Sequence, residues 1–167
     1  CIRDSCSLDL YHARQLCQMI EPFQIEFFEE PVTQNDVRQL SELRSQTTIR
    51  LACGQNEGQA YRFRDMMIAG AVDIIQPNVA ITGGFTQCQK IAALANSFNI
   101  SVDNGGAWPF FNQHLQAGLS NGGLVEYHYS SVEVCKRLYI GLTEPKRGWL
   151  TMTCLLYTSD AADDGLC

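Results

Sequence analysis

The strongest constraint on this chain is a regular alternation of short apolar strands with amphipathic helices. Strand-like segments end near positions 28, 53, 76, 102 and 127, which gives a repeat of about 25 residues. Strands that alternate with helices at this period are typical of repeated βα units around a parallel sheet. The sequence therefore predicts an α/β fold of about five such units, either an open doubly wound sheet or part of a closed β/α barrel.

Hydrophobic periodicity sets the expected limits of each element. Helices are expected over residues 10–20, 36–44, 60–69 and 110–119, with a further helix after Gly83-Gly84. Strands are expected over residues 25–28, 49–53, 72–76, 100–102 and 124–127. No GxGxxG motif opens a helix, which weighs against a dinucleotide-binding open sheet. An open-sheet nucleotide binder would likewise require a phosphate-binding loop, and the sequence contains no such loop.

Composition argues against two classes of partner. Among 167 residues, 18 are acidic and 12 are basic, giving a net charge of −6, and no Lys/Arg stripe is present, so no nucleic-acid partner is expected. No apolar run approaches the ~18–20 residues that span a bilayer, so no membrane association is expected.

Six of the eight cysteines precede residue 154 and form no CxxC pair or Cys/His metal spacing. We therefore expect free thiols in a reducing, cytoplasmic compartment.

The two ends of the chain suggest its domain organisation. The sequence opens at Cys1 with no Met and no signal-peptide pattern, so we interpret it as starting inside a longer reading frame. Residues 154–164 resemble one reading frame of a transposase-type sequencing adapter. We therefore expect a partial barrel domain over residues 1–153 and a non-native read-through tail over residues 154–167. The alternative for the tail is a genuine acidic segment.

Polar side chains gather where each predicted strand gives way to its loop. They are Glu29-Glu30, Gln55-Asn56, Gln76 with Asn78, Asp103-Asn104, and Glu126 with His128. In a parallel barrel these positions all lie at the carboxyl-end mouth, where active sites of that architecture are found. One polar residue after a strand is ordinarily a solvated loop or a helix cap, whereas five in succession favour a shared site.

The adjacent carboxylates Glu29 and Glu30 follow the first predicted strand directly. Side chains alternate along a strand, so Glu29 shares a face with Phe27 while Glu30 shares the other face with Phe28. Only one carboxylate can therefore point into a barrel lumen, and it would need a cation beside it. The alternative interpretation is a helix-start cap with a paired surface Glu.

Four motifs, taken in order and at matching spacing, resemble one known family. They are FFEEPV at 27–32, ACGQNEG at 52–58, AVDIIQPN at 71–78 and TGGFT at 82–86. From about Asp9 to Met152, the chain resembles the enolase superfamily, in particular members of its mandelate racemase/muconate lactonizing enzyme branch with sugar-acid dehydratase character. The resemblance implies a modified TIM-type β/α barrel with an amino-terminal capping domain, and a homo-oligomeric parent enzyme.

The resemblance also implies Mg²⁺ held by three acidic ligands at the ends of successive strands. The cation would offset the charge that develops when a base removes the proton α to a carboxylate. Glu29 matches the second ligand position, and Gln55 falls at the third, where the family pattern has Glu. A Gln carbonyl can ligate Mg²⁺ but brings no charge, so the expected affinity falls. For the first ligand, a gap-free count reaches Arg3, and Asp4 stands one place later.

The acid/base groups depart from the family pattern. The His–Asp dyad of racemases would need Asp at Asn78 and His near Gly105, and the Lys of muconate-type enzymes would lie within residues 72–76, where none occurs. The family's other base, a Lys on the second barrel strand, would precede Cys1, so the catalytic residues are unknown. The expected substrate-binding residues are Asn56, Asn78, Asn104 and Glu126.

The function implied is a fragment of a Mg²⁺-dependent lyase or isomerase that acts on a small-molecule carboxylate, a hydroxy or sugar acid. A dehydratase is favoured over a racemase because the dyad for two-sided proton transfer is absent. The alternative is a non-catalytic, degenerate barrel that binds acid sugars, toward which Gln55, Asn78 and Gly105 all point. The isolated chain is expected to show no turnover and to keep an unpaired, adhesive sheet edge.

Overall fold

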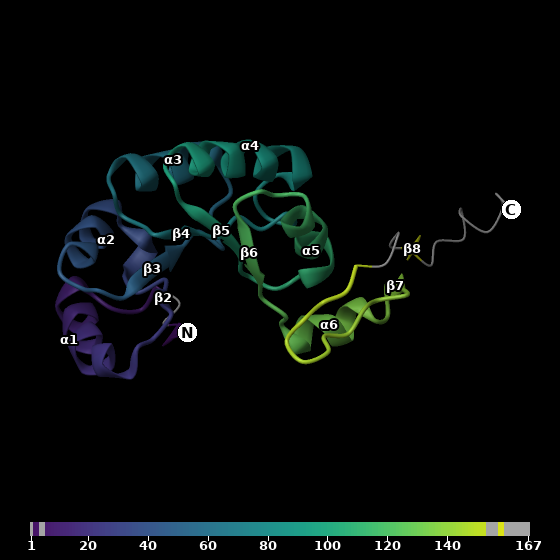
Figure 1. The fold of residues 1–167 in the computed structure, drawn as a ribbon, viewed down its shortest axis with the longest axis horizontal. Helices are drawn as coiled ribbons and strands as arrows, with labels where there is room; N and C mark the ends of the chain where they lie inside the picture. The colour runs from purple at the N-terminus through teal and green to yellow at the C-terminus, as the bar shows by residue number, and fades with distance from the viewer. Residues whose placement is uncertain (1, 4–5, 153–156, 159–167) are drawn as a thin grey trace, which may run out of the picture.

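The computed structural model describes residues 2–3, 6–152 and 157–158. Six strands form one parallel sheet in the order β1-β2-β3-β4-β5-β6 (Figure 1). Their bounds are β1 Ile2–Arg3, β2 Phe27–Glu29, β3 Arg50–Cys53, β4 Ile74–Ile75, β5 Ser101–Asn104 and β6 Gly122–Val125. Two further short strands, β7 (Tyr139–Ile140) and β8 (Tyr157–Thr158), pair antiparallel outside this sheet.

The strand order distinguishes the two predicted architectures. A doubly wound sheet reverses its strand order at a switch point, whereas here each strand lies beside the next one in the chain. Helices α1 to α5 follow an arc around the outer side of the curved sheet, as expected of a singly wound barrel wall (Figure 1). The predicted α/β partial barrel is therefore confirmed, with six strands where about five units were expected.

The helices agree closely with the sequence pattern. They are α1 Leu10–Ile20, α2 Val37–Arg44, α3 Ala60–Ile68, α4 Gly84–Ser97, α5 Pro109–Ala117 and α6 Tyr129–Cys135, with 3-10 turns at Glu21–Phe23 and Thr33–Asn35. Asp36 is the N-cap of α2, since its side chain accepts from the backbone N–H of Gln39. Helix α5 begins one residue earlier than predicted because Pro109 occupies its first turn, where no N–H is needed.

The strands differ more from their predicted limits, and α6, β7 and β8 were not predicted. Apolar runs mark burial, whereas strand limits follow the backbone pairing between neighbours. The predicted strand over residues 72–76 is observed only as β4, although the backbone N–H groups of Asp73 and Gln76 still donate to carbonyl oxygens of β3. The predicted strand over 124–127 lies instead at β6, whose Gly122 pairs with Val102.

The two faces of the sheet carry different side chains. Phe28, Leu51 and Ile75 belong to the large core cluster, which also includes apolar residues of helices α1 to α4. On the other face, Phe27 and Ala52 form a small cluster with Ile74. The alternation therefore assigns Phe28 to the helix-covered outer face and Phe27 to the inner face, which would line the barrel lumen.

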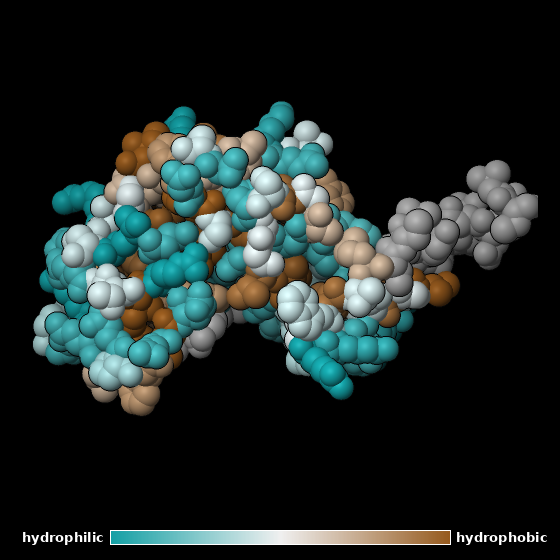
Figure 2. Space-filling view, in the orientation of Figure 1, coloured by the Kyte–Doolittle hydropathy of each residue, from teal (hydrophilic) through white to brown (hydrophobic). Residues whose placement is uncertain are grey.

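The structure also bears on the predictions about thiols, membrane-spanning helices and the tail. The described cysteines Cys6, Cys17, Cys53, Cys88 and Cys135 are free thiols, as predicted. Among the described residues, none of the helices has both the length and the apolar character needed to cross a bilayer. Figure 2 shows a largely hydrophilic visible face with smaller exposed hydrophobic areas. The tail predicted over residues 154–167 falls almost wholly outside the described residues and stays a prediction.

A charged hydrogen-bond network joins α2 to strands β3 and β4 through Asp73. Asp73 Oδ1 accepts from Arg44 Nε at 2.9 Å and Nη2 at 2.7 Å, and Asp73 Oδ2 accepts from the backbone N–H of Leu51 at 2.9 Å. Ion pairing with Asp73 raises the pKa of Arg44. Since Leu51 is fully buried, its N–H would lose its partner if the carboxylate were removed.

We expect Asp73→Ala to lower the free energy of unfolding by about 2 kcal/mol, because it orphans a buried N–H and breaks a half-exposed ion pair. Urea unfolding followed by circular dichroism measures this. Asp65→Ala is the matched control, because among the described residues Asp65 forms an ion pair with its exposed sequence neighbour Arg64 alone. Equal losses in the two variants would contradict the network's role.

Candidate metal centre at the carboxyl edge of the sheet

Glu29 and Glu30 lie at the end of β2, where strand alternation predicts that their side chains diverge. Glu29 closes the strand, is 5 % exposed, and pairs in register with the inner-face residue Ala52. Glu30 has a left-handed backbone with φ 46°, and its side chain is fully buried. The alternative of a helix-start cap with a paired surface Glu is therefore wrong, because both carboxylates are buried and Asp36 caps the following α-helix.

Glu30 is bound by three side-chain amides. Asn35 Nδ2 donates to its Oε1 at 3.1 Å, while Gln55 Nε2 and Asn56 Nδ2 donate to its Oε2 at 2.9 and 3.2 Å. The buried Glu30 carboxylate contributes to raised pKa values of two nearby thiols. Burial, followed by the Glu30 carboxylate, raises the pKa of Cys6 to about 12 and also raises the pKa of Cys53.

Gln55 follows β3 through a sharp backbone turn at Gly54. Gly54 has φ 114°, and a Cβ there would lie 2.5 Å from Phe63 Cε1, so only glycine fits. Gln55 is fully buried. Its Nε2 donates to Glu30, whereas its Oε1 is buried and accepts no hydrogen bond from any residue that the structure describes. A buried carbonyl oxygen thus stands at the position where the sequence predicted a metal ligand.

Asn78 holds the loop that follows β5. Its Nδ2 lies 2.7 Å from the carbonyl oxygens of both Gly105 and Gly106 and 3.1 Å from that of Ala107, and its Oδ1 accepts from the N–H of Ala80. The protein therefore engages both polar groups of this fully buried side chain. The predicted substrate contact of Asn78 stays a prediction that this geometry does not favour.

Two further side chains fix the same loop. Glu126 Oε2 accepts from the N–H groups of Gly106 and Ala107, and Asn112 Nδ2 donates to the Ala107 carbonyl at 3.2 Å. Ala107 and Trp108 both have positive φ values, so the loop needs such anchors. Glu126 was predicted to contact substrate, and the structure shows it as an anchor of this loop.

Gln76 and Asn104 bring two more amide groups to the edge. Asn104 Nδ2 donates to the Pro77 carbonyl, and the Oδ1 of Asn104 and the Oε1 of Gln76 are buried with no hydrogen-bond partner in the described part of the chain. A Cβ on Gly105 would lie 3.0 Å from Gln76 Nε2 and 3.2 Å from Gln55 Oε1. Glycine at position 105 therefore allows two amide side chains to approach the end of β5.

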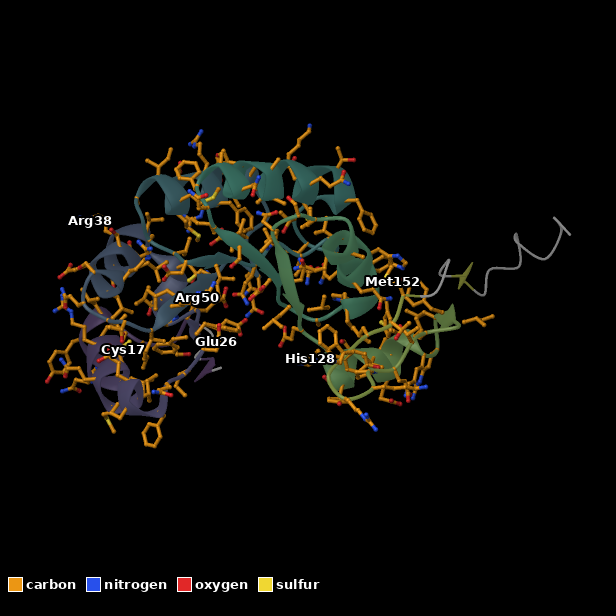
Figure 3. The ribbon with its side chains drawn as sticks, viewed as in Figure 1. Cys17, Glu26, Arg38, Arg50, His128 and Met152 are labelled. Carbon is orange, nitrogen blue, oxygen red and sulfur yellow. The ribbon has the colours of Figure 1, made fainter. Side chains whose placement is uncertain are left out.

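Charged groups at the opposite, amino-terminal ends of the strands hold neighbouring strands together. Arg50 donates to Glu26 Oε1 and to Ser101 Oγ, each at 3.0 Å, and Figure 3 shows Arg50 and Glu26 side by side. The Arg50 contacts therefore tie the start of β3 to the segment before β2 and to the start of β5. Nearer the carboxyl ends, Asp103 Oδ1 accepts from the N–H of Leu124 and joins β5 to β6, and burial raises the pKa of Asp103.

Most of the predicted site residues lie at the carboxyl edge of the sheet. Gln55, Asn78 and Asn104 are buried there, and Asn56 is exposed but reaches Glu30. Asp4 lies outside the described residues, although β1 pairs Arg3 in register with Glu29, at the place the gap-free count had given. Sequence reasoning missed the central role of Glu30. Its signal was the same FFEEPV motif that drew attention to Glu29.

The donor set fits a hard divalent cation in part. Glu29 and Gln55 supply a carboxylate and a buried amide oxygen at the ends of adjacent strands, and Mg²⁺ prefers oxygen ligands. Within the described residues, no three His, Cys, Asp or Glu side chains form a metal-binding group. The two oxygens therefore suit Mg²⁺ but bring a single negative charge, which predicts weak binding unless a further ligand contributes.

A separate cavity of about 750 Å³ lies between α5, β6 and the segment near residue 150. Gln116, Leu124, Tyr127 and Trp149 are among its lining residues, and none of the predicted site residues lines it. In Figure 3, the lining residue Met152 lies well apart from Glu26 and Arg50. This cavity is therefore not the predicted centre.

Known proteins resemble the chain in sequence and in fold. A sequence model of the enolase C-terminal domain-like family matches residues 5–153. D-galactonate dehydratase of Xanthomonas oryzae pv. oryzae is 34 % identical over 88 residues, which cover 53 % of this chain and 23 % of that protein. The chain therefore spans less than a quarter of this curated relative.

Two solved structures show the same arrangement of strands and helices. The 3,6-anhydro-D-galactonate cycloisomerase of Zobellia galactanivorans has a TM-score of 0.85 at 26 % identity, covering 98 % of this chain and 48 % of that one. L-talarate dehydratase of Polaromonas sp. JS666, crystallised with Mg and L-glucarate, has a TM-score of 0.80 at 25 % identity, covering 89 % of this chain and 40 % of that one.

Proposed function

The chain belongs to the enolase C-terminal domain-like family, and on that premise we propose that it forms part of a Mg²⁺-dependent enzyme that removes the proton α to the carboxylate of a sugar acid. One observation carries the proposal. Glu29 closes β2, and the buried Gln55 follows the neighbouring strand β3 with a side-chain Oε1 that accepts no hydrogen bond from the described residues. A dehydratase is the favoured reaction, and dehydratases of galactonate and talarate are among the related proteins.

In this proposal Glu29 and Gln55 would hold the cation, together with a first ligand near Asp4. Bound Mg²⁺ supplies positive charge that stabilises the carboxylate of the substrate as its α proton leaves. Asn104 Oδ1 is buried and accepts no hydrogen bond from the described residues. A substrate hydroxyl could therefore donate a hydrogen bond to it. Glu126 and Asn78 serve the substrate indirectly, because they fix the 105–107 backbone at the edge of the site.

A second candidate function follows from the neutral groups at the site. Gln55 brings no charge to the position where the family pattern has Glu, and Asn78 is engaged in holding a loop. A barrel that binds acid sugars without catalysis would need neither a third carboxylate nor a dyad. This alternative predicts sugar-acid binding that does not depend on a metal.

Calorimetric titration with D-galactonate separates the two functions. The 167-residue chain is expected to bind D-galactonate in Mg²⁺ and to lose at least about tenfold in affinity after treatment with EDTA, since the cation links both partners. No dehydration product is expected from the chain alone, because the position at which the family pattern has its Lys base is not among these 167 residues. Glu29→Gln should abolish the Mg²⁺ effect, and the exposed Glu42→Gln should not. Equal affinity with Mg²⁺ and EDTA would support the non-catalytic binder, and no binding in either would contradict both.

A further inference from the structure

Glu30 accepts hydrogen bonds from three amides although it is fully buried. Asn35 binds one carboxylate oxygen, and Gln55 and Asn56 bind the other. In all three contacts the amide turns its NH₂ group toward Glu30, whose carboxylate oxygens accept the hydrogen bonds. The orientation of all three amides is therefore fixed by one residue.

This constraint decides which end of Gln55 is available to a ligand. Because Nε2 faces Glu30 at 2.9 Å, Oε1 must point away from it. Oε1 lies near the end of β5, 3.2 Å from the place a Gly105 Cβ would occupy, and accepts no hydrogen bond from the described residues. With the opposite orientation, the NH₂ group would occupy this place and could not ligate a cation.

We propose that Glu30 is the positioning residue that presents the Gln55 carbonyl oxygen as a neutral metal ligand. This inference rests on the proposed function, since it assigns Gln55 a metal to hold. Glu30 itself makes no contact with the cation. A Glu at position 55 would set a second carboxylate at the 2.9 Å contact that Gln55 now makes with Glu30, and the two charges would repel each other unless a cation lay beside them.

Glu30→Gln tests the proposal in the full 167-residue chain. The new amide can offer its NH₂ group to position 55, so Gln55 would rotate its carbonyl oxygen toward residue 30. We expect the Kd for Mg²⁺ to rise about 10- to 100-fold, as is typical when the partner that orients a ligand is lost. Glu26→Gln is the matched control, because it removes the same charge from an exposed side chain of the same segment.

The exchanged pair, Glu30→Gln with Gln55→Glu, provides the rescue. Gln at 30 would donate to Glu at 55, which restores the hydrogen bond with its direction reversed and leaves one charged oxygen for the cation. Mg²⁺ affinity should return at least to the wild-type value in this double variant. Gln55→Glu alone should lower Tm in EDTA and recover it in Mg²⁺, because the added cation relieves the repulsion between two carboxylates.

A spectroscopic readout separates this inference from the proposed function. In wild-type protein, the Gln55 side-chain NH₂ protons should exchange slowly with solvent, and the exchange should become fast in Glu30→Gln. Slow exchange without any Mg²⁺ binding would refute the proposed function and, with it, the ligand role of Gln55. Mg²⁺ binding that is unchanged in Glu30→Gln, or wild-type Gln55 protons that exchange fast, would overturn the positioning role while leaving the proposed function intact.

Discussion

Replacing Asn78 with Asp is expected to lower the free energy of unfolding by about 3 to 5 kcal/mol, although Asp is the residue that a racemase-type dyad would place there. The reason is the direction of the hydrogen bonds. Asn78 Nδ2 donates to the carbonyl oxygens of residues 105, 106 and 107. A carboxylate would face those same oxygens with negative charge and without a proton to donate.

The measurement is urea unfolding followed by circular dichroism at neutral pH. Asn96→Asp is the matched control, because Asn96 is exposed on α4 and the same charge there should change stability by less than about 0.5 kcal/mol. A loss of stability in Asn78→Asp no larger than in the control would show that the loop does not depend on this amide.

Gly54→Ala is expected to cost about 3 kcal/mol and to disturb Gln55. The substitution meets two penalties, a left-handed backbone at φ 114° and a Cβ placed 2.5 Å from Phe63 Cε1 in the core. Since Gly54 makes the turn that delivers Gln55 to Glu30, relief of the clash must shift one of these residues. Mg²⁺ affinity should therefore fall together with stability.

Gly58→Ala in the same loop is the control for Gly54. A Cβ at position 58 would have only one neighbour, the Ile81 carbonyl oxygen at 4.0 Å, and its backbone is not left-handed. Thermal unfolding with and without Mg²⁺ compares the two variants. An unchanged Tm in Gly54→Ala would contradict the account of the β3 turn.

Much of the fold follows from local pattern. The helix over residues 10–20 was predicted at its observed limits, because Ala13, Cys17 and Ile20 recur at helical spacing and are buried. The strand at β4 was predicted too long, since the apolar run shows burial and does not show where the pairing with β3 and β5 ends. Helix α6 was missed because its seven residues, YSSVEVC, include two serines and two β-branched valines, which are weaker helix formers than Ala or Leu.

The sequence predicts at which edge of the sheet the site lies, but not which side chains contact each other there. Strand alternation predicts that Glu29 and Glu30 diverge, and that prediction needs nothing beyond two adjacent residues. The partners of Glu30 come from Asn35 and from residues about 25 positions away, Gln55 and Asn56, so no local pattern could reveal them. The same holds for Asn78, whose partners lie 27 to 29 residues further along the chain.

A crystal structure of the chain soaked with Mn²⁺, read by anomalous scattering, is the most direct test of a shared cation. Mn²⁺ takes the same oxygen ligands as Mg²⁺ and can be located without ambiguity. If Glu29 and Gln55 share one cation, we expect one metal bonded to a Glu29 carboxylate oxygen and to Gln55 Oε1, each at about 2.1 Å. A metal bound elsewhere, or these two oxygens directed to separate places, would contradict it.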